Sequence, residues 1–404
     1  MTEKISFIHA ADLHLDSPFQ GLADLPDHIF SKVKESTFVA LDRLVETAID
    51  YDVDFVLLVG DLFDHERQSL KAQVKLREAF ETLYSYGINV YLSYGNHDFL
   101  TGNIYPITYP ENVFIFGTEE VTSFTYEKEG KKLANIYGFS YENRAVTENK
   151  ANEYEVEDES IPYHIAMLHG SLYGNKDHAP YAPFRLTDLQ VKPFDYWALG
   201  HIHERTILSE RPPIVYPGNT QGRHRHETGE KGCYYVELTK TETNVTFIPL
   251  QAILFETVKV DVSHCNQIDE IERKLRSLFT HIDDCKLIYL TFVSDNGMIH
   301  TFEAEGLLKQ LIDIVNDSYV KHDVWHYIYD YRIETNIVDR KVTNEFFVTE
   351  LHQTFDHLHL QEQLADLYHH PVGRKFLQQV SNEEVKNEAK QYLFHQLLKS
   401  GEGE

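Results

Sequence analysis

Cysteine is scarce in this sequence, and long apolar runs are missing. Cys233, Cys265 and Cys285 are odd in number and lack the paired spacing of a zinc site or a disulfide framework. No apolar run approaches the length of a membrane span. Residues 1–4 lead directly into a strand-like segment, without the features of a secretory signal. These absences predict a protein of the reducing cytoplasm, with no membrane association.

Basic residues are few relative to acidic ones. Lys and Arg number 37 against 64 Asp and Glu, which gives a formal net charge of −27. Proteins that bind nucleic acid gain affinity by replacing the counterions of phosphates with Lys and Arg, so this balance argues against a generic nucleic-acid binder. Histidine, in contrast, occurs 23 times, and neutral imidazole is a common metal ligand.

The first part of the chain alternates between short apolar runs and segments with helical periodicity. Unbroken apolar runs predict buried strands at 5–10, 55–59, 90–92 and 164–168. Apolar residues at helical spacing predict helices at 38–49 and 70–84. Paired alternating segments predict hairpins within 122–137 and 233–250. This succession is typical of a layered α/β domain.

The rest of the chain divides into two parts. Residues 254–340 alternate strand and helix patterns, which predicts a small α+β module. Residues 341–404 show helical periodicity throughout, and an apolar stripe of that kind most often packs against its own domain. Because a chain of this length forms two or three domains, we expect an α/β domain at 1–253, an α+β domain at 254–340 and a helical tail at 341–404.

Five short polar motifs follow apolar runs of the first domain. Ligands gather beyond the carboxyl ends of strands in layered α/β folds, so motifs in these positions can converge on one site. Their side chains are carboxylates, imidazoles and one amide, which suit manganese, iron or zinc held for catalysis. In chain order the motifs are Asp12-Leu13-His14, Gly60-Asp61-Leu62-Phe63-Asp64, Gly95-Asn96-His97-Asp98, His169-Gly170 and Gly200-His201-Ile202-His203.

Taken singly, each motif also fits a structural role. Asp12 alone is typical of a turn, and Asn96-His97-Asp98 alone is typical of an Asx turn. A lone histidine on an apolar strand, such as His169, is more often a hydrogen-bonded core residue than a ligand. The order of all five motifs along the chain decides between these interpretations.

In that order, the motifs resemble those of the calcineurin-like metallophosphoesterase superfamily over about residues 5–250. The resemblance implies a four-layer α/β/β/α sandwich that binds two divalent cations. One cation is then assigned to Asp12, His14 and His203, and the other to Asn96, His169 and His201. Asp61 is assigned to a bridge between the two cations, and His97 to catalysis.

The resemblance also implies a mechanism of phosphoester hydrolysis. Two cations about 4 Å apart bind the phosphate oxygens and lower the pKa of a shared water, which supplies a nucleophile at neutral pH. His97 is expected to stabilise charge on phosphorus or to protonate the departing oxygen, with Asp98 as the partner that orients it. Manganese (Mn²⁺) is the expected metal, with iron and zinc as alternatives.

Three longer segments resemble the bacterial SbcD-type branch of DNA-repair nucleases, and within it the YhaO-type subfamily. These segments are Phe7–Asp16, Gly60–Asp64 and Val215–Arg223. The resemblance implies DNA as substrate, an SbcC-like coiled-coil ATPase as partner and a homodimer. It also implies that residues 254–340 form a cap over the active site and that the tail docks on the ATPase.

Two residues in these segments raise separate questions. Asp64 stands where archaeal and eukaryotic relatives usually have a second histidine, next to His65 here, and we do not count it as a ligand. Arg223 is predicted to bind the substrate through the DNA backbone, and its alternative role is to pair with acidic residues such as Glu227 at the surface.

The acidity of the chain keeps two other functions open. An ATPase partner that provides most of the phosphate-neutralising surface reconciles a charge of −27 with a nuclease subunit. A stand-alone nucleotide or cyclic-nucleotide phosphodiesterase fits the acidic surface more directly. A subunit with a mainly architectural role in an ATPase complex is the third possibility.

Overall fold

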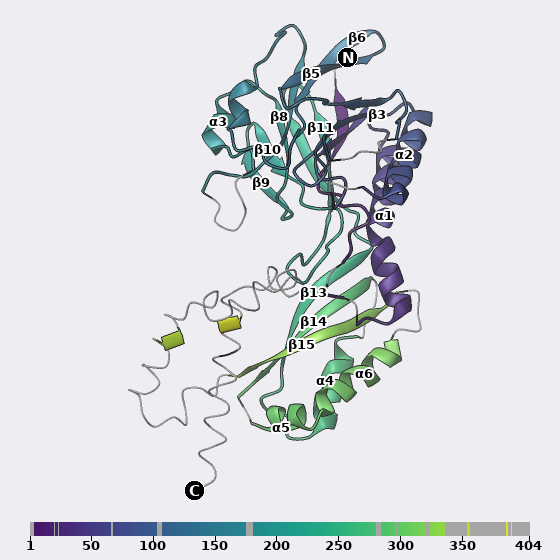
Figure 1. Ribbon diagram of the computed structural model, residues 1–404, viewed down its shortest axis with the longest axis vertical. Coiled ribbons are helices and arrows are strands. Elements are labelled where there is room, and N and C mark those ends of the chain that lie inside the picture. Colours follow the sequence, from purple (N-terminus) through teal and green to yellow (C-terminus); the bar gives the residue numbers. More distant parts are fainter. Residues whose placement is uncertain are drawn as a thin grey trace. The chain divides into compact units, whose positions relative to one another are not determined.

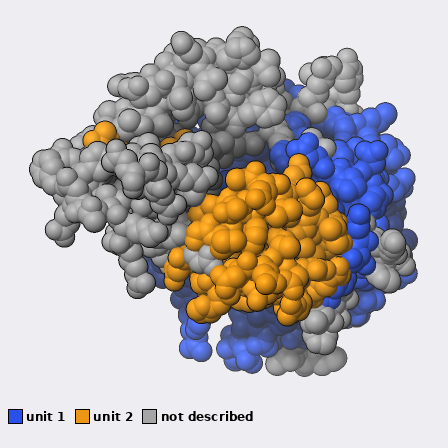
Figure 2. Space-filling model, turned by 90° about the horizontal axis from the view of Figure 1, so that it is seen from below, with its two compact units in different colours: residues 1–258, 279–289, 316–330 blue, residues 259–278, 290–315, 331–404 orange. Residues whose placement is uncertain are grey.

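The computed structural model of the protein describes residues 4–19, 21–22, 24–65, 68–102, 107–174, 181–279, 284–295, 297–319, 324–335, 354–355, 385–386 and 389. The chain falls into two compact units (Figure 2). Unit 1 comprises residues 1–258, 279–289 and 316–330, and unit 2 comprises residues 259–278, 290–315 and 331–404. Apart from isolated positions, the expected helical tail at 341–404 lies outside the described residues and stays a prediction.

Unit 1 is built around two six-stranded sheets (Figure 1). The first has the strand order β12-β11-β1-β2-β3-β4, in which β1 to β4 are parallel and the hairpin of β11 and β12 joins β1 antiparallel. Its strands are β1 (Ile5–Ala10), β2 (Phe55–Val59), β3 (Asn89–Ser93), β4 (Val113–Ile115), β11 (Gly232–Leu238) and β12 (Thr243–Pro249).

The second sheet has the strand order β5-β6-β7-β8-β10-β9. Its four central strands are parallel, and β5 and β9 pair antiparallel at the two edges. Its strands are β5 (Thr122–Lys128), β6 (Lys131–Gly138), β7 (Tyr163–His169), β8 (Tyr196–Gly200), β9 (Thr206–Glu210) and β10 (Pro213–Tyr216). Both hairpins predicted from the sequence are confirmed, as β5 with β6 and β11 with β12.

Helices accompany both sheets. The first sheet packs against α1 (Asp27–Asp50) and α2 (Leu70–Ser85), and the second against η1 (Lys150–Glu153) and α3 (Leu186–Gln190). Helix α2 begins where the hydroxyl of Ser69 accepts a hydrogen bond from the backbone N–H of Ala72 at 3.1 Å. Such an N-cap satisfies a donor that has no partner inside the helix.

Three apolar cores separate these layers. On one face of the first sheet, Ile8, Val56 and Leu58 pack against α1 and α2. On its other face, side chains such as Leu57 pack against the second sheet. The far face of the second sheet, including Trp197, packs under α3 and η1. Strands covered on both faces are apolar at nearly every position, which is why they read as unbroken runs. The predicted four-layer α/β/β/α sandwich is confirmed.

A three-stranded sheet, in the order β13-β14-β15, follows in the sequence. Its strands are β13 (Ile253–Asp261), β14 (Cys285–Ser294) and β15 (His326–Thr335), and the helices between them are α4 (Ile268–Ser277), α5 (Met298–Ala304) and α6 (Leu307–Tyr319). The boundary between the units runs through all three strands, so the expected domain boundary at 253/254 stays a prediction. Within the described part of the chain, no helix is both long and apolar enough for a membrane span.

Candidate metal centre

Five loops at the carboxyl ends of strands carry the polar motifs. The motif residues at or just after the ends of β1, β2, β3, β7 and β8 are Asp12, Asp61, Asn96, His169 and His201. Backbone hydrogen bonds tie the first two loops together: the N–H of Asp12 donates to the carbonyl of Gly60 at 3.1 Å, and that of His14 to the carbonyl of Asp61 at 3.0 Å. The two sheets therefore bring these loops to one place, as expected for a layered α/β fold.

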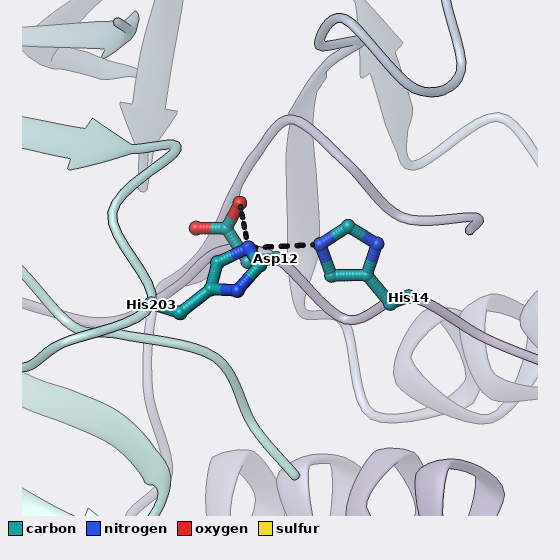
Figure 3. A group of neighbouring side chains, drawn as sticks. All are labelled: Asp12, His14 and His203. Atoms are coloured by element: carbon teal, nitrogen blue, oxygen red, sulfur yellow. Dashed lines mark hydrogen bonds and ion pairs between the residues drawn. The ribbon is translucent and has the colours of Figure 1, made fainter. Parts of the chain in front are cut away.

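Asp12, His14 and His203 form a first group, which we call half-site A (Figure 3). Nε2 of His14 lies 3.1 Å from Nε2 of His203, which lies 3.7 Å from Oδ1 of Asp12. Two imidazole nitrogens and a carboxylate oxygen at these separations can share one divalent cation.

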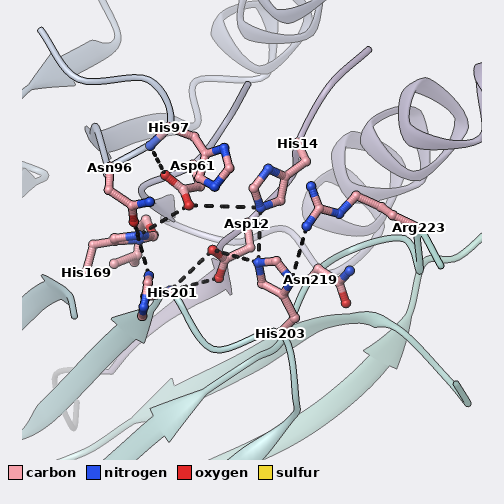
Figure 4. Close-up of polar contacts among 12 residues, drawn as sticks. Asp12, His14, Asp61, Asn96, His97, His169, His201, His203, Asn219 and Arg223 are labelled. Carbon is pink, nitrogen blue, oxygen red and sulfur yellow. Dashed lines mark hydrogen bonds and ion pairs between the residues drawn. The ribbon is translucent and has the colours of Figure 1, made fainter. Parts of the chain in front are cut away.

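Asp61, Asn96, His169 and His201 form a second group, half-site B (Figure 4). Nε2 of His169 lies 3.4 Å from Oδ2 of Asp61 and 3.1 Å from Oδ1 of Asn96, and Nδ1 of His201 lies 3.1 Å from the same Asn96 oxygen. Oδ2 of Asp61 also lies 3.9 Å from Nε2 of His14 in half-site A. The structure therefore brings together all seven side chains that the sequence predicted as ligands, with Asp61 between the two groups.

Four of these residues have a strained backbone. φ is +53° at Asp12, +42° at His14, +50° at Asp61 and +95° at His201, in the region that L-residues rarely adopt. Such conformations cost about 1–3 kcal/mol each and gather at functional sites, where they aim a side chain that an ordinary backbone would misdirect.

Glycines such as Gly95 and Gly200 allow close approach to half-site B. A Cβ on Gly95 would lie 2.3 Å from Oδ1 of Asp61, and a Cβ on Gly200 would lie 2.1 Å from the carbonyl oxygen of Val59 and 2.8 Å from Nδ1 of His169. Any side chain at either position would push a ligand or the backbone out of place.

The buried charges shift one another's pKa values. Burial raises the pKa of Asp12 to about 6 and lowers the pKa of His14 to about 3. Burial alone would raise the pKa of Asp61, but the charge and hydrogen bond of His169 hold it well below its usual value. The pKa of His169, which burial alone would lower, is raised to about 9 by Asp61. A cation can replace the proton on His169 and satisfy the same carboxylates, so the donor set fits a metal.

In each histidine, the ring nitrogen that points away from the cluster determines which nitrogen faces the candidate metal position. Nδ1 of His169 lies 3.0 Å from the carbonyl oxygen of Val59, and Nδ1 of His203 lies 2.6 Å from Oε1 of Glu227. Both partners only accept, so each Nδ1 carries a proton and each Nε2 offers its lone pair to the centre. This is the arrangement that a metal-binding histidine requires, and it supports the fit of these residues to divalent cations.

His97 lies beside the half-sites rather than within them. Its backbone N–H donates to Oδ1 of Asp61 at 2.9 Å, and its Nδ1 donates to the carbonyl oxygen of Asp64 at 2.8 Å. The ring stands edge-on to that of His14, with centroids 5.0 Å apart. Nε2 is therefore the ring nitrogen that remains for a substrate.

Asp98 has a different place from the one predicted. The sequence assigned it the orientation of His97, but its carboxylate accepts hydrogen bonds from the backbone N–H groups of Gly95 and Leu62, both at 2.7 Å. Burial, with the nearby charge of Asp61, raises its pKa to about 7. Asp98 thus ties the loop after β3 to the loop after β2, and the carbonyl of Asp64 orients the imidazole of His97.

Arg223 lies beside half-site A, with 14% of its side chain exposed, and contacts Asp64 and Glu227. Its expected contact with DNA stays a prediction. Sequence reasoning placed Glu227 at the surface and gave Asn219 no role, whereas both side chains are buried next to His203. The signal that pointed to this loop was the resemblance of Val215–Arg223 to a nuclease branch, which did not reveal the partners.

Comparison with known proteins shows the family to which the chain belongs. The family model "Calcineurin-like phosphoesterase" matches residues 5–205. The chain is 40% identical over 395 residues to the metallophosphoesterase YhaO of Bacillus subtilis, an alignment that covers 96% of this chain and 95% of that protein. The chain belongs to the calcineurin-like phosphoesterase family, as its motifs predicted.

More distant relatives have names that refer to DNA repair. The chain is 26% identical over 298 residues to the DNA double-strand break repair protein Mre11 of Methanocaldococcus jannaschii, with 69% of this chain and 74% of that protein covered. It is 26% identical over 262 residues to the protein of the same name from Thermoplasma acidophilum, with 61% and 67% covered. These similarities are consistent with the SbcD-type branch and support phosphoester hydrolysis with divalent metals.

Proposed function

We propose that the protein hydrolyses DNA phosphodiester bonds as the nuclease subunit of a repair complex. The supporting observation is the extent of the similarity to Mre11 of M. jannaschii, which spans 298 residues and so reaches well beyond the match to the family model at 5–205. The metallophosphoesterase core serves many phosphoesters, and a similarity confined to it would leave the substrate open. Similarity that extends beyond this core therefore favours DNA, to which the name of that relative refers.

Half-sites A and B are proposed to hold one divalent cation each, with Asp61 between them. Manganese is the proposed metal, since carboxylate, imidazole and amide ligands without thiolates suit it, and iron and zinc are the alternatives. When bound, the pair of cations neutralises phosphate charge and lowers the pKa of a water molecule. The strained backbone of Asp12 and Asp61 supports this proposal, because it holds their carboxylates in place before a cation arrives.

His97 is proposed to move the proton. Because its Nδ1 donates to the carbonyl oxygen of Asp64, its Nε2 is the atom that meets the substrate. In its protonated form this nitrogen stabilises charge on the phosphoryl oxygens or donates its proton to the departing oxygen. Asp98 supports the same step indirectly, since it ties together the loops that carry His97 and Asp61.

An SbcC-like coiled-coil ATPase is the proposed partner, with the protein acting as a homodimer in the cytoplasm. The net charge of −27 supports a partner that supplies the phosphate-neutralising surface. In this proposal residues 254–340 act as the cap and the tail docks on the ATPase. The same charge favours one other candidate, a stand-alone phosphodiesterase of nucleotides or cyclic nucleotides.

The test is digestion of single- and double-stranded DNA with Mn²⁺, with and without the ATPase, beside hydrolysis of mononucleotides and of a small chromogenic diester. Cleavage of DNA that the ATPase stimulates supports the proposal. A monomer that hydrolyses only mononucleotides contradicts it in favour of the stand-alone phosphodiesterase. A protein that binds the ATPase but cleaves no phosphoester contradicts it in favour of the architectural role.

A further inference from the structure

Three charged side chains lie together behind half-site A. Asp64, Arg223 and Glu227 have 11%, 14% and 7% of their side chains exposed. Nη1 of Arg223 donates to Oδ1 of Asp64, and its Nη2 lies 3.3 Å from Nδ1 of His203 and 3.6 Å from Oε1 of Glu227. One guanidinium therefore joins two buried carboxylates, and we call these three residues the clamp.

Each carboxylate of the clamp faces the outer nitrogen of one ligand of half-site A. Oδ1 of Asp64 lies 3.4 Å from Nδ1 of His14, and Oε1 of Glu227 lies 2.6 Å from Nδ1 of His203. A carboxylate facing an imidazole nitrogen favours a proton on that nitrogen. Both Nε2 atoms, which are 3.1 Å apart, then direct lone pairs at each other. Two facing lone pairs repel unless a cation lies between them.

The other oxygen of Glu227 is also held. Its Oε2 accepts hydrogen bonds from the backbone N–H of Arg223 at 2.7 Å and from Nδ2 of Asn219 at 2.9 Å. Asn219 is fully buried and donates to the carbonyl of Gln221 as well, at 2.8 Å. The clamp is therefore fixed to the backbone of the loop that follows β10. Its three side chains are not surface groups free to choose other partners.

We propose that the clamp is a positioning device for half-site A. Arg223 holds Asp64 and Glu227 in place, and these carboxylates hold His14 and His203 with both Nε2 atoms toward one cation. Arg223 is thus a positioning residue that sets the affinity of half-site A for its metal. The inference rests on the two-cation site of the proposed function, but it does not depend on DNA being the substrate.

Other roles can be proposed for these residues, and two of them lead to different results. If Arg223 acted only through its charge, its removal would strengthen cation binding, because it would remove a positive charge near the metal. If Arg223 bound only the DNA backbone, its removal would leave the metals unchanged. Asp64 also lies near His97 and His14 in a group that could hold a cation, but such a site would compete with the guanidinium of Arg223 for the same carboxylate.

The experiment is a titration of the metal-free, full-length protein with Mn²⁺. Calorimetry and electron paramagnetic resonance both monitor the binding. Arg223→Gln removes the charge and the bridge, while Arg223→Lys keeps the charge but loses the planar fork that can join two carboxylates. Arg211→Gln is the matched control, since Arg211 is an exposed arginine in the turn between β9 and β10.

The wild type is expected to bind two Mn²⁺ and to give the spectrum of a coupled pair. In Arg223→Gln one Mn²⁺ should bind as in the wild type and the other about 10–100-fold more weakly, the usual effect of losing a residue that supports a ligand. The coupled spectrum should then give way to that of isolated Mn²⁺ at low metal concentration. Arg223→Lys should share the defect in weaker form, and Arg211→Gln should match the wild type.

Unchanged or tighter binding of both metals by Arg223→Gln overturns the inference, even if DNA cleavage is lost. Equal weakening of both metals also overturns it, because it marks a general structural defect. If Arg223→Gln fails to fold, Asp64→Asn replaces it, with the same expectation for one metal. A wild type that binds fewer than two Mn²⁺ contradicts the proposed function itself, so the two failures are distinguishable.

Discussion

The two half-sites hold their candidate ligands by different means. In half-site B, the outer nitrogen of His169 donates to the backbone carbonyl of Val59, a bond that runs from the last residue of β7 to the last residue of β2. In half-site A, the outer nitrogens of His14 and His203 face the carboxylates of Asp64 and Glu227. His169 is thus supported by the strands of the sandwich, whereas the two histidines of half-site A are supported by side chains.

The difference lies in whether the backbone of the fold or the side chains of a loop hold the histidines. A backbone carbonyl at the end of a buried strand is present whatever its side chain, so half-site B follows from the meeting of the two sheets. The support of the two histidines of half-site A depends on the identities of three side chains, so single substitutions can change it. We therefore expect substitutions outside the ligands to affect the two metals unequally.

Asp61→Asn should weaken cation binding at both half-sites, so that they no longer differ. Its carboxylate is buried and lies between His14 and His169, so the neutral amide would deprive both cations of a shared negative ligand. Loss of several kcal/mol of transition-state stabilisation corresponds to about a 10⁴-fold fall in activity on a small diester. Metal analysis of the purified variant should find less than one ion per chain. A variant that keeps two ions contradicts the bridging role.

His97→Ala should leave both half-sites loaded and still slow turnover severely. The ring contacts half-site A at its edge without belonging to either group of ligands. Loss of a group that transfers a proton lowers the rate by about 10²–10⁴-fold. Steady-state hydrolysis of the small diester gives the rate, and metal content is measured on the same sample. Full activity with two metals bound would remove His97 from the mechanism.

Gly200→Ala should weaken half-site B and spare half-site A, the reverse of Arg223→Gln. The new Cβ would lie 2.1 Å from the carbonyl oxygen of Val59, in a part of the framework that cannot yield easily. Overpacking of this kind costs about 1–3 kcal/mol of stability. Gly117→Ala is the control, because a Cβ there meets nothing within 4 Å. Calorimetric Mn²⁺ titration and thermal unfolding should both distinguish the two variants, and identical behaviour contradicts the account.

His9 is held in a third way, because both of its ring nitrogens have protein partners. Its Nδ1 lies 3.0 Å from the hydroxyl of Tyr196 and its Nε2 donates to the carbonyl of Leu199 at 3.0 Å, while burial lowers its pKa from 6.5 to about 3. The unfolded chain therefore takes up a proton at His9 below pH 6.5 that the folded chain does not. The contribution of neutral His9 to folding stability is fully present above pH 6.5 and is lost as the pH falls toward 3.

This effect should be the smallest of the four. Between pH 6.5 and 5, His9 should cost the metal-free protein roughly 1.5 kcal/mol of unfolding free energy. In His9→Gln the decline with falling pH should be shallower by that amount, as measured by urea unfolding at a series of pH values. His28→Gln, at an exposed position of α1, is the matched control. Parallel pH profiles for wild type and His9→Gln contradict the prediction.

The sequence predicted the sandwich because its strands are simple to recognise. Strands β1 and β2 are buried on both faces and therefore appear as unbroken apolar runs, and each is followed by a polar motif. Short strands with mixed exposure, such as β9, gave no such pattern and were not predicted. The seven candidate ligands could be named because they occur in an ordered set of motifs, each next to a strand.

The surroundings of the ligands could not be predicted in the same way. Glu227 and Asp64 are far apart in the sequence, and only the folded loop after β10 brings Arg223 between them. The partner of the His97 ring is a backbone carbonyl, which no residue type reveals. Asp98 was assigned to His97 because the two are adjacent in the chain, whereas its carboxylate reaches the backbone of Gly95 and Leu62.

The two-cation site is best tested by a crystal structure of the protein with Mn²⁺, with anomalous scattering data collected for manganese. We expect two anomalous peaks about 4 Å apart, one within bonding distance of Asp12, His14 and His203 and the other within bonding distance of Asn96, His169 and His201, with Asp61 touching both. A single peak, or two peaks that do not share Asp61, would contradict it.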